Sequence, residues 1–218
     1  MRPGVHHCIV ERRSIFLDLA RDRYFALPAN LDAAFMRAID SSGVPSVTAD
    51  EIERLMKAGV LVAVDEPEAP ISPDTPTMPM FDRSTSPVEV RPSPATVVGV
   101  VLTQLVAWLI VRIIPMRFVV RHLQRIHARV DKHAGDMTAM DKLAAGFRVA
   151  GVLLKSEGNC LPRTLAFVWL AHRRGCHANL VIGVRINPFS AHCWPQHGDV
   201  VLNDRMDRVA QFQPILRV

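Results

Sequence analysis

The sequence has few cysteines and no motif that pairs them. Four cysteines occur in 218 residues at irregular spacings, none in a Cys-x-x-Cys arrangement: Cys8, Cys160, Cys176 and Cys193. A disulfide framework is therefore not expected. Residues 1–7 also lack the apolar run of a signal peptide, so we expect a cytoplasmic protein with reduced thiols.

Signals for nucleotides, nucleic acids and cofactors are missing as well. No phosphate-binding loop is present, so we expect no ATP site and no cofactor. The net charge of +5 suits an acidic partner. Four arginines recur at helical spacing and form a stripe: Arg117, Arg121, Arg125 and Arg129. No aromatic residues that could stack on bases alternate with them, which argues against binding of nucleic acid. We interpret this stripe as a solvated face, with docking on an acidic partner or an anionic lipid surface as the alternative.

Residues 1–64 are expected to form a small winged-helix-like domain. Apolar stretches separated by tight charged turns predict a three-stranded antiparallel sheet: His7–Glu11, Ile15–Asp18 and Arg23–Leu27. A helix capped by Asn30 is expected over Leu31–Asp40. A second helix begins after Thr48, in a capping box with Glu51. The inward face of this helix is expected to consist of Ile52, Leu55 and Met56. A short extended piece, Val60–Val64, follows the helix and completes the domain.

Residues 65–95 are predicted to be a linker. They hold eight of the sixteen prolines, and proline recurs every third residue from Pro67 to Pro79. This spacing favours polyproline II over helix or sheet, which gives a stiff tether between two domains.

The third region, residues 96–218, opens with the apolar run 97–111. No charge occurs between Arg91 and Arg112, which nearly reaches the roughly 20 residues that span a bilayer. The polar pair Thr103 and Gln104 in its middle favours a helix that is buried or apposed to a membrane over one that spans it.

Cys160, His192 and Asp204 are the candidate catalytic residues. Cys160 begins a helical pattern that continues to about Arg174. A thiol in the first turn of a helix faces unpaired backbone N–H groups and the positive end of the helix dipole, which favour the thiolate and can form an oxyanion hole. An imidazole and then a carboxylate follow along the chain, and these are the groups that a cysteine hydrolase uses.

A hairpin is expected to bring the imidazole and the carboxylate together. Residues 191–196 and 200–204 are predicted to be its strands. A three-residue loop centred on Gly198 would place His192 opposite Asp204, whereas a two-residue turn at His197–Gly198 would pair His192 with Asn203. The site therefore requires an odd loop or a bulge.

Other side chains compete for these roles. Asp199 lies at the loop tip and is expected to be solvated. Strand alternation directs Cys193 away from the face of His192, so we interpret Cys193 as a packing residue. No metal is expected, because the cysteines and histidines lack recognisable ligand spacing. Three further histidines are alternative bases: His172, His177 and His197.

Four stretches resemble the transglutaminase-like peptidase of lasso-peptide biosynthesis: Cys160–Arg163, Ile182–Val184, Ala191–Trp194 and Val201–Asp204. In that family the B protein removes the leader of a ribosomal precursor peptide. The resemblance covers residues 96–218 and implies a transglutaminase- or papain-like α+β domain. It assigns the nucleophile, base and orienting carboxylate to Cys160, His192 and Asp204. Family members work with an asparagine-synthetase-like cyclase that uses ATP, so the precursor peptide and this cyclase are the expected partners.

The first region is similar to the leader-recognition domain of such systems, of the pyrroloquinoline-quinone D-type chaperone kind. Phe16–Leu19 and Arg23–Leu27 carry the likeness. Such domains bind the leader as an added strand beside the third strand and against the last helix. The likeness implies a leader-binding set in this chain: Arg23, Tyr24, Phe25, Leu27, Arg54 and Lys57.

The whole sequence is thus expected to have an α+β fold, with a winged-helix-like recognition domain linked to a cysteine peptidase domain. The expected function is removal of the leader in lasso-peptide maturation. Three alternatives stay open: a non-catalytic escort that binds the leader and supports the cyclase, a membrane-anchored regulator built on the helix near 97–111, and a transamidase in which an amine replaces water.

Overall fold

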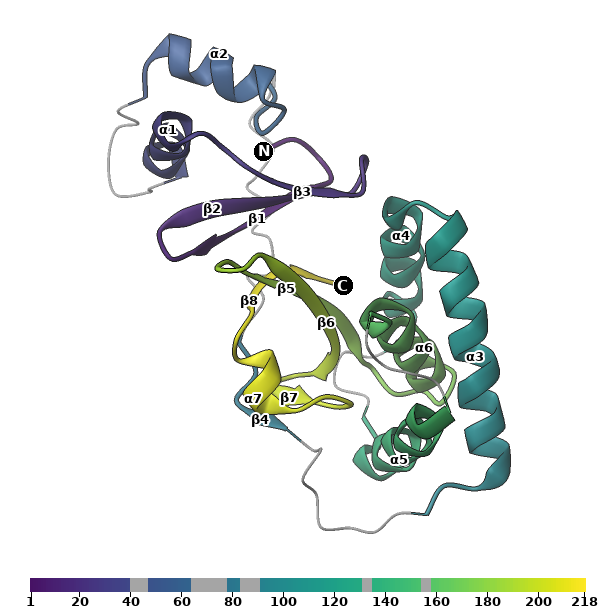
Figure 1. The fold of residues 1–218 in the computed structure, drawn as a ribbon. Coiled ribbons are helices and arrows are strands. Elements are labelled where there is room, and N and C mark those ends of the chain that lie inside the picture. Colours follow the sequence, from purple (N-terminus) through teal and green to yellow (C-terminus); the bar gives the residue numbers. More distant parts are fainter. Residues whose placement is uncertain (40–46, 64–77, 83–90, 131–134, 154–157) are drawn as a thin grey trace. The chain divides into compact units, whose positions relative to one another are not determined.

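A computed structural model describes residues 1–39, 47–63, 78–82, 91–130, 135–153 and 158–218. The chain has a mixed α/β fold and divides into two compact units, Met1–Thr75 and Pro76–Val218 (Figure 1). Each unit is described by itself below.

The N-terminal unit contains the three-stranded antiparallel sheet that the sequence predicts. Its strands are β1 (Val5–Val10), β2 (Arg13–Asp18) and β3 (Arg23–Ala26), in the order β1-β2-β3. Glu11 and Arg12 both adopt positive φ between β1 and β2, the conformation of a two-residue hairpin turn whose twist matches the strands.

Two helices follow, α1 (Ala29–Ile39) and α2 (Ala49–Lys57). The predicted capping box is confirmed: the Thr48 hydroxyl accepts the Glu51 N–H at 3.3 Å, and the Thr48 N–H donates to the Glu51 carboxylate at 2.9 Å. The predicted cap at Asn30 is wrong, because α1 already begins at Ala29, directly after Pro28.

The core of this unit is built around Phe16, Phe35 and Leu55, all fully buried. Leu55 is the member of the predicted inward face of α2 that enters this core. Ile52 and Met56 were expected beside it but are exposed, because the nine-residue helix presents only a narrow stripe to the unit. The strand expected over Val60–Val64 is also absent over residues 60–63, where the backbone joins no sheet; Val64 lies outside the described residues.

The C-terminal unit combines a five-stranded sheet with helices (Figure 1). The sheet order is β4-β7-β6-β5-β8, and every neighbouring pair is antiparallel except the parallel pair β4–β7. The strands are β4 (Phe81–Asp82), β5 (Asn179–Arg185), β6 (Ser190–His197), β7 (Val200–Val201) and β8 (Gln213–Arg217). The helices are α3 (Pro94–Ile113), α4 (Met116–His127), α5 (Met137–Leu153), α6 (Cys160–His172) and α7 (Met206–Val209).

Helix α6 is the central helix of this unit. It packs on β6 and β5, and α3 and α5 pack on it in turn, so that α6 lies between the sheet and these two helices (Figure 1). Most of its side chains are buried, among them Leu165, Phe167 and Val168. The Thr164 hydroxyl donates to the Cys193 carbonyl at 3.1 Å and fixes the helix against β6.

Part of the predicted linker lies in the C-terminal sheet. Phe81–Asp82 pairs with β7, and the Met80 and Phe81 N–H groups both donate to the Asp199 carbonyl, at 2.9 and 3.1 Å. Most of the proline-rich segment, residues 64–77, lies outside the described residues, as do residues 83–90.

Helix α3 is buried on one face only. Val100, Gln104 and Ala107 are buried, whereas Leu102, Leu105 and Leu109 are among the exposed apolar side chains. We expected a helix that is buried or apposed to a membrane; the described residues bury this one stripe and leave the other apolar side chains exposed. By length and composition alone, α3 is apolar enough to cross a membrane.

Four histidines form a cluster in the C-terminal unit: His127, His172, His177 and His197. The His172 ring lies 4.5 Å from that of His127, centroid to centroid, and neither His172 ring nitrogen has a hydrogen-bond partner among the described residues. Burial, followed by the neighbouring rings of His127 and His177, lowers the pKa of His172 to about 4. His172 is therefore packed in its neutral form.

A first prediction concerns Gly183, because a Cβ there would lie 2.8 Å from the ring of the fully buried Trp194. Gly183→Ala should destabilise the C-terminal unit by about 1–3 kcal/mol, the usual cost of overpacking. Urea unfolding followed by tryptophan fluorescence measures this, since all three tryptophans lie in that unit. Gly99→Ala on α3 is the control: its Cβ would meet nothing within 4 Å and should stabilise the helix. Equal stability of Gly183→Ala and wild type would contradict the close approach.

A second prediction follows from the neutral His172. An unfolded histidine has a pKa near 6.5, so between pH 6.5 and about 4 the unfolded chain binds a proton that the folded chain excludes. Stability should therefore fall as the pH falls through this window, by about 2 kcal/mol at pH 5 for this one group. His172→Phe keeps an aromatic ring and should flatten this part of the pH profile. An unchanged profile in the variant would show that His172 is not responsible.

Candidate active site

The start of α6 positions the Cys160 thiol. The helix predicted from Cys160 begins at that residue, and Gly175, with φ +72°, follows its end as expected. Pro162 is tolerated in the first turn because no intrahelical partner exists there for its missing N–H. Cys160 thus lies at the end of the helix where backbone N–H groups are unpaired and the dipole is positive.

The hairpin after β6 differs from both predicted registers. β6 pairs with β7 as Gln196↔Val201 and His197↔Val200, so the turn consists of two residues, Gly198–Asp199. Continued pairing in this register would place residue 205, not Asp204, opposite His192. The ladder instead ends after Val201, and the backbone bends over residues 202–204. This bend, and not the odd loop or bulge that we expected, turns Asp204 toward His192.

The bend brings Asp204 to His192. His192 Nε2 and Asp204 Oδ2 lie 2.5 Å apart, and both side chains are largely buried. The other carboxylate oxygen of Asp204 accepts the Arg205 N–H at 2.8 Å, which fixes its orientation. Because Nε2 is engaged by Asp204, Nδ1 is the ring nitrogen left for the Cys160 thiol, with which His192 also interacts.

The electrostatic interactions between His192 and Asp204 favour the ionised form of both side chains. Burial opposes ionisation of His192, but the hydrogen bond with Asp204 and the contact with Cys160 outweigh it and raise the pKa of the imidazole. Burial likewise opposes ionisation of Asp204, but the hydrogen bonds from His192 and the Arg205 backbone lower the pKa of the carboxyl. The imidazolium and the carboxylate therefore stabilise each other.

Cys193 faces Cys160, and its interpretation as a packing residue directed away from the site is wrong. A hydrogen bond from the Cys193 thiol is the largest influence on the pKa of Cys160; burial opposes it, and His192 reinforces it, with the result that the pKa falls to about 4. Burial, followed by the neighbouring Cys160 sulfur, raises the pKa of Cys193. Cys193 is thus a protonated donor beside a thiolate. Simple alternation failed because the Cys160 sulfur also accepts a hydrogen bond from the Cys193 backbone N–H, which places it beside the strand rather than over one face.

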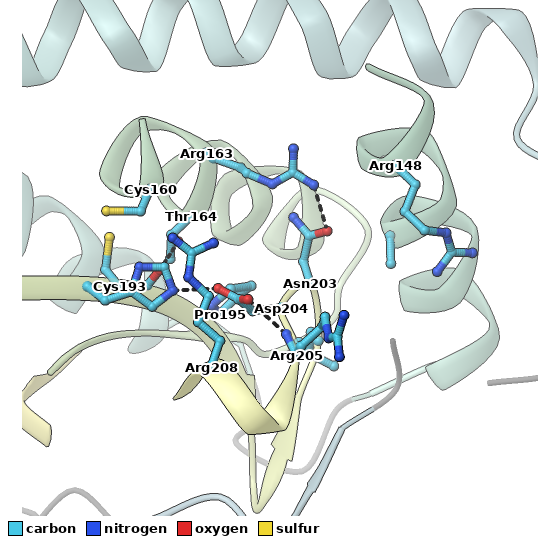
Figure 2. Close-up of a pocket in the computed structure, with 13 residues that line it drawn as sticks. Arg148, Cys160, Arg163, Thr164, Cys193, Pro195, Asn203, Asp204, Arg205 and Arg208 are labelled. Carbon is cyan, nitrogen blue, oxygen red and sulfur yellow. Dashed lines mark hydrogen bonds and ion pairs between the residues drawn. The ribbon is translucent and has the colours of Figure 1, made fainter. Parts of the chain in front are cut away.

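These side chains line a cavity of about 540 Å³ (Figure 2). Its walls are the residues from α5, α6, β6 and the 202–208 segment: Ala144, Arg148, Cys160, Arg163, Thr164, His192, Cys193, Pro195, Leu202, Asn203, Asp204, Arg205 and Arg208. Arg163 donates to the Asn203 side chain at 3.2 Å, which ties α6 to the bend before Asp204. No sequence motif marks the four arginines, because they come from three separate stretches that only the tertiary fold brings together.

The alternative bases lie elsewhere. His172, His177 and His197 belong to the histidine cluster and do not line this cavity. Asp199 lies in the hairpin turn and is exposed, as expected. Within the described parts of the chain, no three His, Cys, Asp or Glu side chains are arranged to hold a metal ion.

The residues expected to bind a leader lie on β3 and α2 or next to β3. β3 is an edge of its sheet, since it pairs with β2 alone among the described strands. Phe25 stacks on Phe16 at 5.1 Å and Leu27 is buried, so both face the core. Arg23 lies 5.6 Å from the Phe25 ring centroid, and Tyr24 points to the opposite face. Arg54 and Lys57 are exposed on α2 and form ion pairs with Asp50 and Glu53.

A third prediction concerns the thiol pair. Iodoacetamide alkylation of Cys160, located by peptide mass spectrometry, should reach its full rate already near pH 5, because the pKa of Cys160 is about 4. Cys193→Ala removes the donor and should move the rate profile to higher pH, with a several-fold slower reaction at pH 5. Cys176→Ala removes a buried thiol outside the cavity and should leave the profile unchanged. Coincident profiles for wild type and Cys193→Ala would rule out the hydrogen bond.

Among known proteins, similarity was found for the C-terminal unit. No curated protein and no solved structure gave a match. A family model, described as the transglutaminase-like superfamily, matches residues 101–217, a segment that includes α6, the sheet from β5 to β8, and all three of Cys160, His192 and Asp204. The match extends over more than half of the 218 residues. The chain therefore belongs to the transglutaminase-like superfamily.

Proposed function

We propose that this protein is a cysteine peptidase that removes the leader from a ribosomal precursor peptide in lasso-peptide maturation. The observation that carries the proposal is the buried His192–Asp204 hydrogen bond beside a thiol of low pKa at the start of α6. The superfamily includes cysteine peptidase-like enzymes, and the resemblance of the flanking stretches narrows the proposal to leader removal.

The proposed mechanism starts from a Cys160 thiolate and a His192 imidazolium, the pair that the two pKa shifts favour. The thiolate attacks the carbonyl carbon of the scissile peptide bond, and the backbone N–H groups of the first turn of α6 stabilise the oxyanion. His192 then donates its proton to the leaving amine as the C–N bond breaks, which leaves an acyl-thioester.

Deacylation reverses the role of the imidazole. Neutral His192 takes a proton from water, the hydroxide attacks the thioester, and the C–S bond breaks to release the acid and restore the thiolate. Asp204 holds the ring with Nε2 turned away from Cys160 and stabilises the positive charge each time it forms. Attack by an amine in place of water would give transamidation from the same thioester.

Leader recognition is assigned to the N-terminal unit. The free edge of β3 offers backbone N–H and C=O groups for an added strand, which supplies affinity, while neighbouring side chains set the register. Phe25 and Leu27 support this edge from the core, Arg23 and Tyr24 lie at its surface, and Arg54 and Lys57 are the cations of α2. Recognition and cleavage in one chain make the second event nearly intramolecular, which raises the local substrate concentration. The proposed partners are the precursor peptide and an ATP-dependent, asparagine-synthetase-like cyclase.

A fourth prediction tests this function. The proposed precursor peptide is incubated with each variant, with and without the proposed cyclase and ATP, and the products are identified by mass spectrometry. Wild type should release a leader fragment; Cys160→Ala should abolish cleavage, and Asp204→Asn should slow it at least about a hundredfold. Asp199→Asn alters a nearby exposed carboxylate outside the cavity and should cleave like wild type.

Leader binding, measured with a labelled leader peptide, separates the alternatives. Cys160→Ala should bind the leader as tightly as wild type. Equal cleavage by Cys160→Ala would remove this residue from the mechanism. Binding without cleavage in every mixture would favour the non-catalytic escort.

A further inference from the structure

Positive charge dominates the wall of the Cys160 cavity. Four arginines line it: Arg148 from α5, Arg163 from α6, and Arg205 and Arg208 from the segment around α7 (Figure 2). Asp204 is the only carboxylate among the described residues that line the cavity. A substrate entering this space therefore meets an excess of cations.

Two of these arginines already have partners. Arg205 forms a two-pronged ion pair with Asp207, at 3.1 and 2.8 Å. Arg163 donates to Asn203 and lies over the Phe147 ring, 5.4 Å from its centroid. Both side chains are thereby held in place.

Arg148 and Arg208 carry the uncompensated charge. Neither guanidinium forms a hydrogen bond or an ion pair with the described residues, and both side chains are exposed toward solvent. The field of Arg208 reaches Asp204 and helps to lower the pKa of that carboxyl. Asp204 carries a single negative charge, which His192 and the Arg205 N–H also engage, so an excess of positive charge remains on the wall of the cavity.

We infer that this cavity selects a substrate with a carboxylate close to the scissile bond, which Arg208 binds, while Arg148, on the side of the cavity away from Cys160, adds to the positive charge that attracts it (Figure 2). Guanidinium groups pair with carboxylates through two parallel N–H···O bonds, and a partly enclosed cavity strengthens this attraction relative to water. The carboxylate comes either from an aspartate or glutamate side chain of the peptide or from its C-terminus. Arg148 and Arg208 are specificity residues in this scheme and take no part in the chemical steps. The inference rests on the proposed peptidase function.

The test uses two alkylating agents of nearly equal size, neutral iodoacetamide and anionic iodoacetate. Their rates with Cys160 at pH 7 are measured by peptide mass spectrometry, and the iodoacetate-to-iodoacetamide ratio is divided by the same ratio for glutathione. We expect the normalised ratio to be about five- to tenfold above one and to fall with added salt, as for an electrostatically attracted ligand. Alkylation needs no turnover, so failure of charge selection and failure of peptide cleavage are observed separately.

Arginine variants show which residues supply the positive charge that attracts iodoacetate. Arg208→Gln should lower the normalised ratio by at least about twofold, Arg148→Gln by less because it lies farther from Cys160 in Figure 2, and the double variant should lower it further. Arg205→Gln should have a smaller effect, because Asp207 already balances Arg205. Arg121→Gln on α4 removes a cation outside the cavity and should change nothing. Tryptophan fluorescence checks that each variant is folded. A normalised ratio near one in wild type would overturn the inference, as would equal ratios in wild type and the double variant.

Short peptides distinguish the two sources of the carboxylate. Three N-acetylated tripeptides are compared as protectants of Cys160 against iodoacetamide: glycine–aspartate–glycine amide, glycine–asparagine–glycine amide, and glycine–asparagine–glycine with a free C-terminus. Protection by the first alone assigns the site to an acidic side chain, and protection by the third alone assigns it to a peptide C-terminus. Either should be lost in the Arg148→Gln, Arg208→Gln double variant. Equal protection by all three would overturn selection for a carboxylate even if the alkylation ratio were high.

Discussion

The contact between α6 and β6 is the constraint on which the candidate site depends. Cys160 is the first residue of the helix and His192 lies within the strand, so their approach is set by how the helix lies on the sheet. Apolar burial along α6 gives this contact its strength, and the Thr164–Cys193 hydrogen bond fixes its position along the strand. A shift of the helix by one turn, about 5 Å, would separate the thiol from both the imidazole and the Cys193 donor.

The carboxylate reaches the site by a different route, because β7 is too short to carry it there. After two paired residues the backbone leaves the sheet, and the Arg163–Asn203 hydrogen bond holds the resulting bend against α6. The helix that positions the thiol therefore also positions the segment that ends in Asp204. The thiol and the acid are coupled through one element.

Local patterns explain what the sequence could predict. The N-terminal sheet, the Thr48 capping box and the start of α6 are each encoded by a few adjacent residues: apolar alternation between turns, a hydroxyl three residues before a glutamate, and a proline in a first turn. The superfamily of the C-terminal unit could also be predicted from the sequence, because its motifs lie in short stretches. Features that depend on residues far away in the sequence could not be predicted from local patterns. Asn30 has a side chain that can cap a helix, but α1 begins earlier, directly after Pro28. Ile52 and Met56 have the expected spacing, but both are exposed.

The features of the site that could not be predicted also depend on tertiary contacts. The contact of Cys193 with Cys160 depends on how near the helix end comes to the strand, which strand alternation does not encode. The arginines of the cavity come from α5, α6 and the segment around α7 and carry no common motif. The pairing of Phe81–Asp82 with β7 joins residues more than a hundred positions apart, in a stretch whose prolines pointed to a linker.

That pairing shortens the connection between the two units. If residues 65–95 were all free, the connection between the two units could extend to roughly 100 Å. Attachment at Met80 and Phe81 leaves only residues 64–77 between the described parts of the two units, and a fully extended chain of that length spans about 50 Å. The stretch that joins the described parts of the two units is therefore about half as long as the whole proline-rich segment, and a sphere of that radius has about an eighth of the volume.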